Sequence, residues 1–496
     1  TAYEISLGLV GSEMCIRDSI WGEVGRGKTL ITSAFLDKCT NIKFKSFHYI
    51  DLMKFIHSKL TEYAGKKDPL KLIKKDLSTE CQLIFIDEFQ VEDVADAMIV
   101  GNLVNALIDD GLKIVYGEKQ FSEDIASLNK SEKIEKVFVC PGNGGTAKEQ
   151  DIENIDLSPT DTPSLIDFAN RENIDLTIVG PEAPLVDGIV DQFNEHNLKI
   201  FGPSKKYALL EGSKVFSKEF MKHYDIPTAD YQMFSSGNEA KDFIKDKQHP
   251  IVIKADGLAA GKGVYISENY NEASKAVDEI FGGKFGNTEN LLIEEFLNGE
   301  EMSFFIISDG QSYKMFGTAQ DHKRVFEGDQ GKNTGGMGAY SPSRLQSDKL
   351  NQKIINNIIE PTLKGLKNLN CEYKGFLYAG LMIVNEEPFL IEYNVRMGDP
   401  ECQTLLPKLK TDFSIIINKC IEQKLQDLNI EWYDDKSICI VLCSKGYPDT
   451  YQNNIALDLE KLKLKKSQFI FHAGTKIINN TIVSNGGSCL LYTSPS

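Results

Sequence analysis

The stretch Pro250-Ile-Val-Ile-Lys254-Ala-Asp-Gly-Leu-Ala-Ala-Gly-Lys262-Gly-Val264 decides the fold of the larger part of this 496-residue chain. Its first residues are an apolar run that predicts a buried strand, and this strand delivers Lys254. A glycine-rich loop follows and carries Lys262. Such a loop can close over a triphosphate and exclude water while the lysines neutralise the phosphate oxygens. By itself the stretch also fits an ordinary flexible turn.

Two further strand-like runs end in polar side chains. In Leu291-Leu-Ile-Glu294-Glu295-Phe-Leu297 the acidic end suits hydrogen bonds from a base and a ribose, although an exposed strand end would read the same way. In Leu390-Ile-Glu392-Tyr-Asn394-Val-Arg396, the residues Glu392 and Asn394 are two apart and share one face of a strand. Both offer oxygen, which Mg²⁺ prefers. Arg396 falls on the same face, where it could hold a carboxylate or a phosphate.

A fourth region combines cations with glycines. Gly317-Thr-Ala-Gln-Asp321-His322-Lys323-Arg324 is followed by Asn333-Thr-Gly-Gly-Met-Gly-Ala339. A plain solvated loop seldom concentrates two cations, an imidazole and a glycine-rich segment in this way. We therefore expect an anion-binding site here.

The front of the chain carries an unrelated nucleotide motif. Gly22-Glu-Val-Gly-Arg-Gly-Lys28-Thr29 fits the phosphate-loop pattern, in which backbone N–H groups cradle phosphates and the Thr holds Mg²⁺. An apolar strand, Leu83-Ile-Phe-Ile-Asp87-Glu88, supplies the carboxylates that organise metal and water in this class. The motifs predict nucleotide binding by Gly25, Gly27, Lys28, Thr29, Asp87 and Glu88.

Composition narrows the function classes. The formal net charge is -17, which argues against a nucleic-acid binder. The ten cysteines are scattered without a Cys-x-x-Cys pair, which indicates reduced thiols in a cytoplasmic protein. No apolar run approaches the ~18 residues of a membrane span, and the first residues do not read as a signal peptide.

The order of the segments resembles that of phosphoribosylamine–glycine ligases, which are ATP-grasp enzymes. The resemblance covers about residues 112–487. It includes Gly180-Pro-Glu-Ala-Pro-Leu185, Leu210-Glu-Gly-Ser-Lys214, His472-Ala-Gly-Thr-Lys476 and Ser484-Asn-Gly-Gly487 besides the segments above.

This resemblance implies an α/β ATP-grasp ligase. Residues 112–212 would form an N-terminal α/β substrate domain with an incomplete first loop, 213–425 a two-part ATP-grasp domain, and 430–487 a small β-rich C-terminal domain. Residues 20–110 would be a partial P-loop α/β fragment. The implied chain is a monomer that uses ATP and Mg²⁺ or Mn²⁺.

The implied reaction joins glycine to 5-phosphoribosylamine through a glycyl phosphate. The residues expected to act in catalysis are Lys254, Arg396, Asp321, Lys323 and Arg324. Those expected to bind ATP are Lys214, Lys254, Gly261, Lys262, Gly263, Glu294, Glu295, Phe296, Leu297 and Glu300. Those expected to bind substrate are Pro181, Glu182, His322, Asn333, Thr334, Gly335, Gly336, Met337 and Gly338. The expected metal ligands are Glu392 and Asn394.

The front segment resembles the cell-division-associated AAA+ ATPases. The resemblance rests on Trp21–Thr29, on Phe47-His-Tyr-Ile-Asp-Leu-Met53 and on Phe85–Met98. It stops near residue 110, before the sensor strand, arginine finger and lid of that family. A P-loop ATPase of the quality-control type, and a nucleotide-binding chimera without turnover, are therefore the alternative functions.

Two departures qualify the ligase interpretation. The family begins with a strand and then Gly-Ser-Gly-Gly-Arg-Glu-His, whereas strand Leu112–Tyr116 is followed here by Gly117-Glu-Lys-Gln-Phe121. An acidic side chain is unfavourable where backbone should approach a phosphate, so we expect an impaired sugar-phosphate site. The two ends, 1–19 and 488–496, resemble translated sequencing adapters, and we expect both to lie outside the fold.

Overall fold

The chain divides into two compact units, Thr1–Glu118 and Lys119–Ser496, which are described separately. The computed structural model describes residues 44–63, 66, 69, 72–73, 75–76, 83–87, 113–115, 131, 134–149, 151–258, 263–286, 288–326, 330–369, 372–459, 462, 464, 468–479 and 481–495. Within these ranges no helix is long and apolar enough to cross a membrane.

The first unit contains a parallel sheet of order β1-β2-β3, formed by Phe44–His48, Leu83–Asp87 and Lys113–Val115. Helix α2 (Tyr49–Glu62) follows β1. This sheet corrects the predicted boundary between residues 110 and 112. The described part of this apolar run, Lys113–Val115, pairs with β2 and belongs to the front unit, not to the ligase-like part. A short apolar run predicts a strand in either sheet, so the sequence did not show which sheet it joins.

The second unit begins with alternating strands and helices, as the sequence predicted. Their bounds are β4 Val137–Val139, η1 Thr146–Lys148, β5 Ile152–Asn154, α6 Thr162–Arg171, β6 Thr177–Ile178, α7 Glu182–Asp187, α8 Ile189–Glu195, β7 Ile200–Phe201 and α9 Lys205–Gly212. β4 pairs with β5 and β6 pairs with β7, both in parallel. The Asp161 side chain caps α6 by accepting from the Ser164 N–H.

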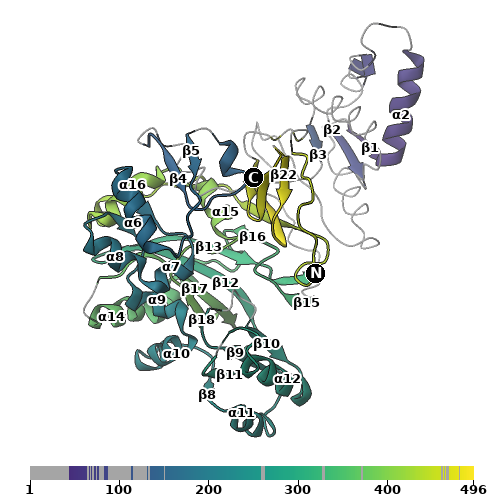
Figure 1. Ribbon diagram of the computed structural model, residues 1–496. Helices are drawn as coiled ribbons and strands as arrows, with labels where there is room; N and C mark the ends of the chain where they lie inside the picture. Colours follow the sequence, from purple (N-terminus) through teal and green to yellow (C-terminus); the bar gives the residue numbers. More distant parts are fainter. Residues whose placement is uncertain are drawn as a thin grey trace. The chain divides into compact units, whose positions relative to one another are not determined.

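A small antiparallel sheet of order β10-β9-β11-β8 follows. Its elements are α10 Lys214–His223, β8 Tyr231–Phe234, α11 Gly237–Ile244, β9 Ile251–Ala255, β10 Val264–Ser267, α12 Tyr270–Phe281 and β11 Leu291–Glu295. α12 turns an apolar stripe toward the sheet, because Ala273, Ala276, Val277 and Ile280 are buried. In Figure 1 this sheet and helices α11 and α12 form one end of the second unit.

A large antiparallel sheet has the order β18-β17-β12-β13-β16-β19-β23-β20. Its strands are β12 Glu300–Asp309, β13 Tyr313–Asp321, β16 Gly338–Ser341, β17 Lys374–Val384, β18 Glu387–Asn394, β19 Ser437–Cys443, β20 Phe469–His472 and β23 Ser488–Pro495. The remaining hairpins are β14 Arg324–Phe326 with β15 Gln330–Asn333, and β21 Thr475–Ile478 with β22 Thr481–Ser484. The remaining helices are α13 Asp348–Ile354, η2 Ile355–Ile359, α14 Glu360–Asn368, α15 Cys402–Leu405, η3 Leu406–Lys408, α16 Phe413–Ile421 and η4 Leu425–Asp427.

The expectation that residues 488–496 take no part in the fold is wrong. Ser488–Pro495 is β23, which pairs with both β19 and β20. Its run Cys489–Tyr492 is buried on both faces, so the segment meets the requirement for a central strand. The predicted C-terminal segment 430–487 also shares this sheet with the preceding segment, because β16 pairs with β19.

Candidate active site

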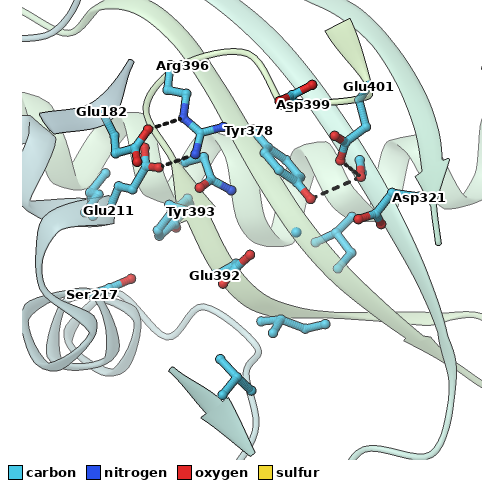
Figure 2. Close-up of a pocket in the computed structure, with 18 of the residues that line it drawn as sticks. Glu182, Glu211, Ser217, Asp321, Tyr378, Glu392, Tyr393, Arg396, Asp399 and Glu401 are labelled. Atoms are coloured by element: carbon cyan, nitrogen blue, oxygen red, sulfur yellow. Dashed lines mark hydrogen bonds and ion pairs between the residues drawn. The ribbon is translucent and has the colours of Figure 1, made fainter. Parts of the chain in front are cut away.

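A cavity of about 700 Å³ lies in the second unit, between the small sheet and strands β12, β17 and β18 of the large one. Many residues singled out from the sequence line it. These are Pro181, Glu182, Lys214, Lys254, Gly263, Glu294, Glu295, Phe296, Leu297, Asp321, Lys323, Thr334, Gly335, Glu392, Asn394 and Arg396. Figure 2 shows the acidic side chains and Arg396 among the residues that line this space.

Two buried lysines share one carboxylate in the cavity wall. Glu294 Oε2, on β11, lies 3.0 Å from Lys254 Nζ of β9 and 3.0 Å from Lys218 Nζ of α10. The three side chains are only 2 to 4% exposed. Burial lowers the pKa of Lys218 to about 8, although Glu294 opposes this shift. Glu294 Oε1 is buried without a hydrogen-bond partner among the described residues. A ligand donor could therefore bind there.

Lys214 is held at the start of α10 by the turn that follows β9. Asp256 Oδ1 accepts from the Lys214 backbone N–H at 2.7 Å, and Lys214 Nζ donates to the Gly257 carbonyl at 2.8 Å. The Ser213 hydroxyl caps the helix by accepting from Phe216 N–H. Burial lowers the pKa of Lys214. The helix cap thus fixes a cation beside Gly257, which follows β9.

Glu392 is the carboxylate at the centre of the positive charges. Burial by itself would raise the pKa of Glu392, but Lys323, Lys254, Lys214 and Arg396 together hold it below its ordinary value. Glu392 therefore stays ionised inside the cavity wall. Asn394 follows it on the same strand, and both line the cavity. Two oxygen donors fit a hard divalent cation such as Mg²⁺, which usually keeps waters or phosphate oxygens as its other ligands.

Arg396 is held between two glutamates. Its NH2 group lies 2.8 Å from Glu211 Oε1, and its Nε lies 3.3 Å from Glu182 Oε2 (Figure 2). The second oxygen of Glu211 accepts from the Val395 N–H at 2.8 Å. Burial raises the pKa of Glu211 to about 7 although Arg396 opposes this shift. This cluster fixes the guanidinium beside the cavity.

A second polar group lies across the cavity from Arg396 in Figure 2 and contains Asp321 and Glu401. Lys323 Nζ lies 3.2 Å from Glu301 Oε2 and 3.7 Å from Asp321 Oδ2. Burial raises the pKa of Asp321 to about 7, although Lys323 opposes this. Burial also raises the pKa of Glu401, whose Oε1 lies 3.0 Å from the Ser303 hydroxyl. Asp321 can therefore exchange a proton near neutral pH.

Several residues predicted for the site do not line the cavity: Glu300, His322, Arg324, Gly336, Met337 and Gly338. Glu300 pairs with Arg344 at the surface. The two glycines instead have packing roles. A Cβ on Gly336, at φ +121°, would lie 2.5 Å from Pro400, and one on Gly338 would lie 2.6 Å from the Cys439 carbonyl oxygen. The end of the expected anion cradle is therefore packed: Gly338 begins strand β16, and Gly336 lies against Pro400 just before it.

Other predicted residues lie wholly or partly outside the ranges that the structure describes. These are Gly25, Gly27, Lys28, Thr29, Glu88, Gly261 and Lys262, and for Asp87 and Asn333 only the backbone is described. Conversely, the structure adds lining residues that the sequence analysis missed: Glu211, Ser217, Lys218, Tyr378, Asp399 and Glu401. Lys218 could have been found, because it follows Lys214 by one helical turn and shares its face.

Comparison with protein families divides the chain in the same way. The description "Phosphoribosylglycinamide synthetase" applies to three matches: its N domain at residues 124–211, its ATP-grasp (A) domain at 212–402 and its C domain at 437–495. The front matches the AFG1-like ATPase family over residues 19–126. That match extends past β3 and agrees with the place of this strand in the first unit.

Curated relatives bear the name phosphoribosylamine–glycine ligase. The chain is 46% identical over 368 residues to the one from Escherichia coli K12 and 44% identical over 369 residues to the one from Clostridium acetobutylicum. Each alignment covers 73% of this chain and 86% of the relative.

Solved structures show the same fold. Phosphoribosylamine–glycine ligase from Thermotoga maritima matches with a TM-score of 0.61 and 31% identity, covering 73% of this chain and 86% of that one. Biotin carboxylase from Campylobacter jejuni matches with a TM-score of 0.52 at 16% identity, over 68% of this chain and 74% of that one. The second likeness concerns the fold alone.

Proposed function

The chain belongs to the phosphoribosylamine–glycine ligase family, and we propose from this premise that its second unit joins glycine to 5-phosphoribosylamine at the expense of ATP. The observation that carries the proposal is one cavity that collects Lys214, Lys254, Glu392, Asn394 and Arg396. The products are glycinamide ribonucleotide, ADP and phosphate, which places the enzyme in de novo purine synthesis.

The nucleotide side of the site comprises the small sheet and α10. Lys214 and Lys254 contact phosphate oxygens, and Gly261, Lys262 and Gly263 close over them. The strand end Glu294–Leu297 meets the base and the ribose. The unpartnered Glu294 Oε1 supports this role, because a buried carboxylate oxygen can accept from an amino group of adenine.

The metal is held by Glu392 and Asn394. Mg²⁺, or Mn²⁺ in its place, neutralises phosphate charge when it is bound there. The lysines that surround Glu392 keep this carboxylate ionised, which a metal ligand must be.

The reaction has two steps. An oxygen of the glycine carboxylate attacks the γ-phosphorus of ATP, the bond to the β-phosphate oxygen breaks, and ADP leaves. The amine of 5-phosphoribosylamine then attacks the glycyl carbonyl carbon, phosphate leaves, and the amine loses a proton. Arg396, Lys323, Thr334 and Gly335, which all line the cavity, orient the two substrates. Catalysis therefore comes from positioning and charge neutralisation in a closed site.

Asp321 is the residue suited to take up the proton of the amine. Its side chain is 6% exposed and lies beside Lys323. Burial raises its pKa to about 7, which matches the working range of a general base at neutral pH. Pro181 and Glu182, which also line the cavity, complete the substrate-binding set. The proposed enzyme is a cytoplasmic monomer with no nucleic-acid partner.

The AFG1-like match supports one competing function, ATP hydrolysis by the first unit. Steady-state ADP release by the full chain distinguishes ligase activity of the second unit from ATP hydrolysis by the first unit. Ligase activity requires both glycine and 5-phosphoribosylamine, is abolished by Glu392→Ala and is unchanged by Lys28→Ala. ADP release that ignores both substrates and is lost in Lys28→Ala would assign turnover to the first unit instead.

A further inference from the structure

Lys218 is a charged residue of the cavity wall to which the proposed reaction gives no role. It lies on α10 one helical turn after Lys214, and both residues line the cavity. Its side chain is only 2% exposed. Burying an ammonium group is costly unless protein partners replace its water, so the partners of Lys218 indicate its role.

Three oxygen atoms surround the Lys218 ammonium group. Its Nζ lies 3.0 Å from Glu294 Oε2, donates to the Thr228 hydroxyl at 2.7 Å, and lies 3.5 Å from the Ala229 carbonyl oxygen. The Thr228 hydroxyl in turn donates to the Leu390 carbonyl oxygen at 2.6 Å. Burial lowers the pKa of Lys218 to about 8, so the group is still mostly charged at pH 7. Lys218 is therefore a fixed cation beside Glu294.

The two carboxylate oxygens of Glu294 have different surroundings. Oε2 lies 3.0 Å from Lys254 Nζ as well as from Lys218 Nζ. Oε1 is buried and has no hydrogen-bond partner among the described residues. Rotation of the carboxylate would take Oε2 away from both ammonium groups. The two lysines together therefore fix the direction in which Oε1 accepts a hydrogen bond.

A second buried polar atom without a partner lies in the same cavity wall. Ser217 precedes Lys218 on α10, is 4% exposed and lines the cavity (Figure 2). Its hydroxyl oxygen has no hydrogen-bond partner among the described residues. Buried polar atoms are nearly always hydrogen-bonded in folded proteins. Two such atoms in one wall indicate that the polar edge of a ligand lies against it.

We propose that Lys218 is a positioning residue for recognition of the nucleotide base. By holding Glu294 Oε2, it keeps Oε1 directed at position 6 of the purine, and so sets a preference for a 6-amino group over a 6-oxo group. This inference rests on the proposed function, in which Glu294 meets the base of ATP. It adds a selection among bases, which the transfer of a terminal phosphoryl group does not itself require.

The chemistry of the two bases gives the reason for the preference. The amino group of adenine donates to Glu294 Oε1. Hypoxanthine has an oxygen at the same position, and two buried acceptors that face each other gain no hydrogen bond and repel. Hypoxanthine also has a donor at N1, from which a carboxylate that turns can accept. With Oε2 held by two ammonium groups, Glu294 does not make this turn.

The test measures the affinities of ADP and of inosine diphosphate (IDP) by calorimetry in the presence of Mg²⁺. The full chain carries Lys28→Ala, so that the phosphate-loop motif of the first unit does not contribute. The two nucleotides differ only in the base, and their binding requires no turnover. We expect IDP to bind at least about tenfold more weakly than ADP, because it leaves Oε1 of Glu294 without a donor.

Lys218→Met in the same background isolates the role of Lys218, because methionine nearly keeps the length of the side chain and removes its charge. The ratio of the Kd of IDP to the Kd of ADP should fall at least about fivefold, since Glu294 keeps only Lys254 and can turn. A merely structural role of Lys218 would weaken the binding of both nucleotides equally and leave this ratio unchanged.

Lys222→Met is the matched control, since Lys222 is exposed and lies one turn further along α10. Its ratio of Kd values should stay within about twofold of that of the parent chain. Circular dichroism and melting are compared first for all variants. If Lys218→Met does not fold, Lys218→Gln, which also removes the charge, replaces it.

Equal affinities of ADP and IDP in the parent chain would overturn the proposal and leave the ligase function standing. An unchanged ratio in a folded Lys218 variant, or an equal fall in Lys222→Met, would overturn it as well. Absent ADP binding would instead contradict the proposed function, and the role of Lys218 with it.

Discussion

Replacing Glu294 by glutamine is the sharpest perturbation of the nucleotide site, because one carboxylate oxygen holds two buried ammonium groups. Both Lys218 Nζ and Lys254 Nζ lie 3.0 Å from Glu294 Oε2. At an effective dielectric constant of about 20, each contact corresponds to roughly 5 kcal/mol of attraction. The cost of burying three charges offsets most of this sum.

Removing the shared partner nevertheless leaves two buried cations without their counter-charge. Among the described residues, Lys218 keeps the Thr228 hydroxyl at 2.7 Å and the Ala229 carbonyl oxygen at 3.5 Å, and Lys254 keeps a 3.4 Å contact to the Ile391 carbonyl oxygen. Breaking a buried ion pair on one side typically costs about 3–5 kcal/mol. We expect Glu294→Gln to lower the free energy of unfolding by about that amount at pH 7, and to weaken ATP binding at least about tenfold.

The neighbouring residue supplies a matched control. Glu295 is exposed, and its Oε1 accepts from the Asp230 N–H at 3.0 Å. We expect Glu295→Gln to change the free energy of unfolding by less than about 1 kcal/mol. Urea unfolding is followed by fluorescence in a Trp21→Phe background. Trp432, packed on Phe316 with ring centroids 5.0 Å apart, then reports on the second unit alone.

The pH dependence of the same pair of variants adds a second test. Burial lowers the pKa of Lys218 to about 8, below its ordinary value of 10.5. The unfolded chain therefore binds more protons between these values, and stability rises with pH across this window. Without Glu294 the pKa of Lys218 in the folded chain falls further, so the free energy of unfolding of Glu294→Gln begins to rise at a lower pH than that of the parent chain. The difference in free energy of unfolding between the variant and the parent chain should therefore narrow as pH approaches 8. Equal stability of the two glutamine variants at pH 7 would refute the reasoning.

Three further predictions follow from the same geometry. Burial raises the pKa of Asp321 to about 7 from 3.8, so the folded chain binds more protons than the unfolded chain between these values and loses stability as pH rises. Asp321→Asn should remove this pH dependence of the free energy of unfolding, which amounts to at most about 1.4 kcal/mol per pH unit between pH 5 and 7 in urea titrations. An unchanged slope of the free energy of unfolding against pH in the variant would contradict this prediction. A lysine at position 396 cannot keep both glutamate contacts of Arg396. In Arg396→Lys the KM of glycine or of 5-phosphoribosylamine should rise at least about tenfold, while the KM of ATP stays within twofold. KM values for both substrates equal to those of the parent chain would exclude the role given to Arg396. The added Cβ of Gly336→Ala would lie against Pro400 at a positive φ, so this variant should lower the free energy of unfolding by about 1–3 kcal/mol. The added Cβ of Gly335→Ala has Tyr447 Oη at 3.9 Å as its one near contact, so this control should lower the free energy of unfolding less. Equal losses in the two variants would count against the packing role of Gly336.

The sequence predicted those parts of the structure whose signal is local. The apolar run before Lys254 is β9, the run ending at Glu294 is β11, and the run carrying Glu392 and Asn394 is β18. Each is a continuous apolar segment bounded by polar residues or glycine, and such a segment forms a buried strand in most contexts. The convergence of these strands on one cavity followed from the family resemblance.

What the sequence did not predict depends on tertiary neighbours. The ion pairs of Lys218 and Glu211 join residues from separate elements, so no local pattern indicates them. Gly338 looked like part of an anion cradle, but its narrow fit against β19 requires a strand that comes about a hundred residues later in the chain.

Strand assignment failed for the same reason. The runs that contain β3 and β23 were assigned by their surroundings in the sequence, whereas pairing of β3 with β2 and of β23 with β19 decided their places. A short apolar run takes whichever sheet offers an open edge of suitable register. The pairing partner of such a run depends on tertiary contacts, which the residues of the run do not indicate.

The most direct test of the ligase mechanism follows an oxygen atom. The full chain is supplied with Mg-ATP, 5-phosphoribosylamine and glycine labelled with ¹⁸O in both carboxylate oxygens, and the released phosphate is examined by mass spectrometry. A glycyl phosphate intermediate predicts one ¹⁸O atom in every phosphate formed, in step with glycinamide ribonucleotide. Release of ADP with unlabelled phosphate would contradict the account, because the carboxylate of glycine would then never have been the acceptor.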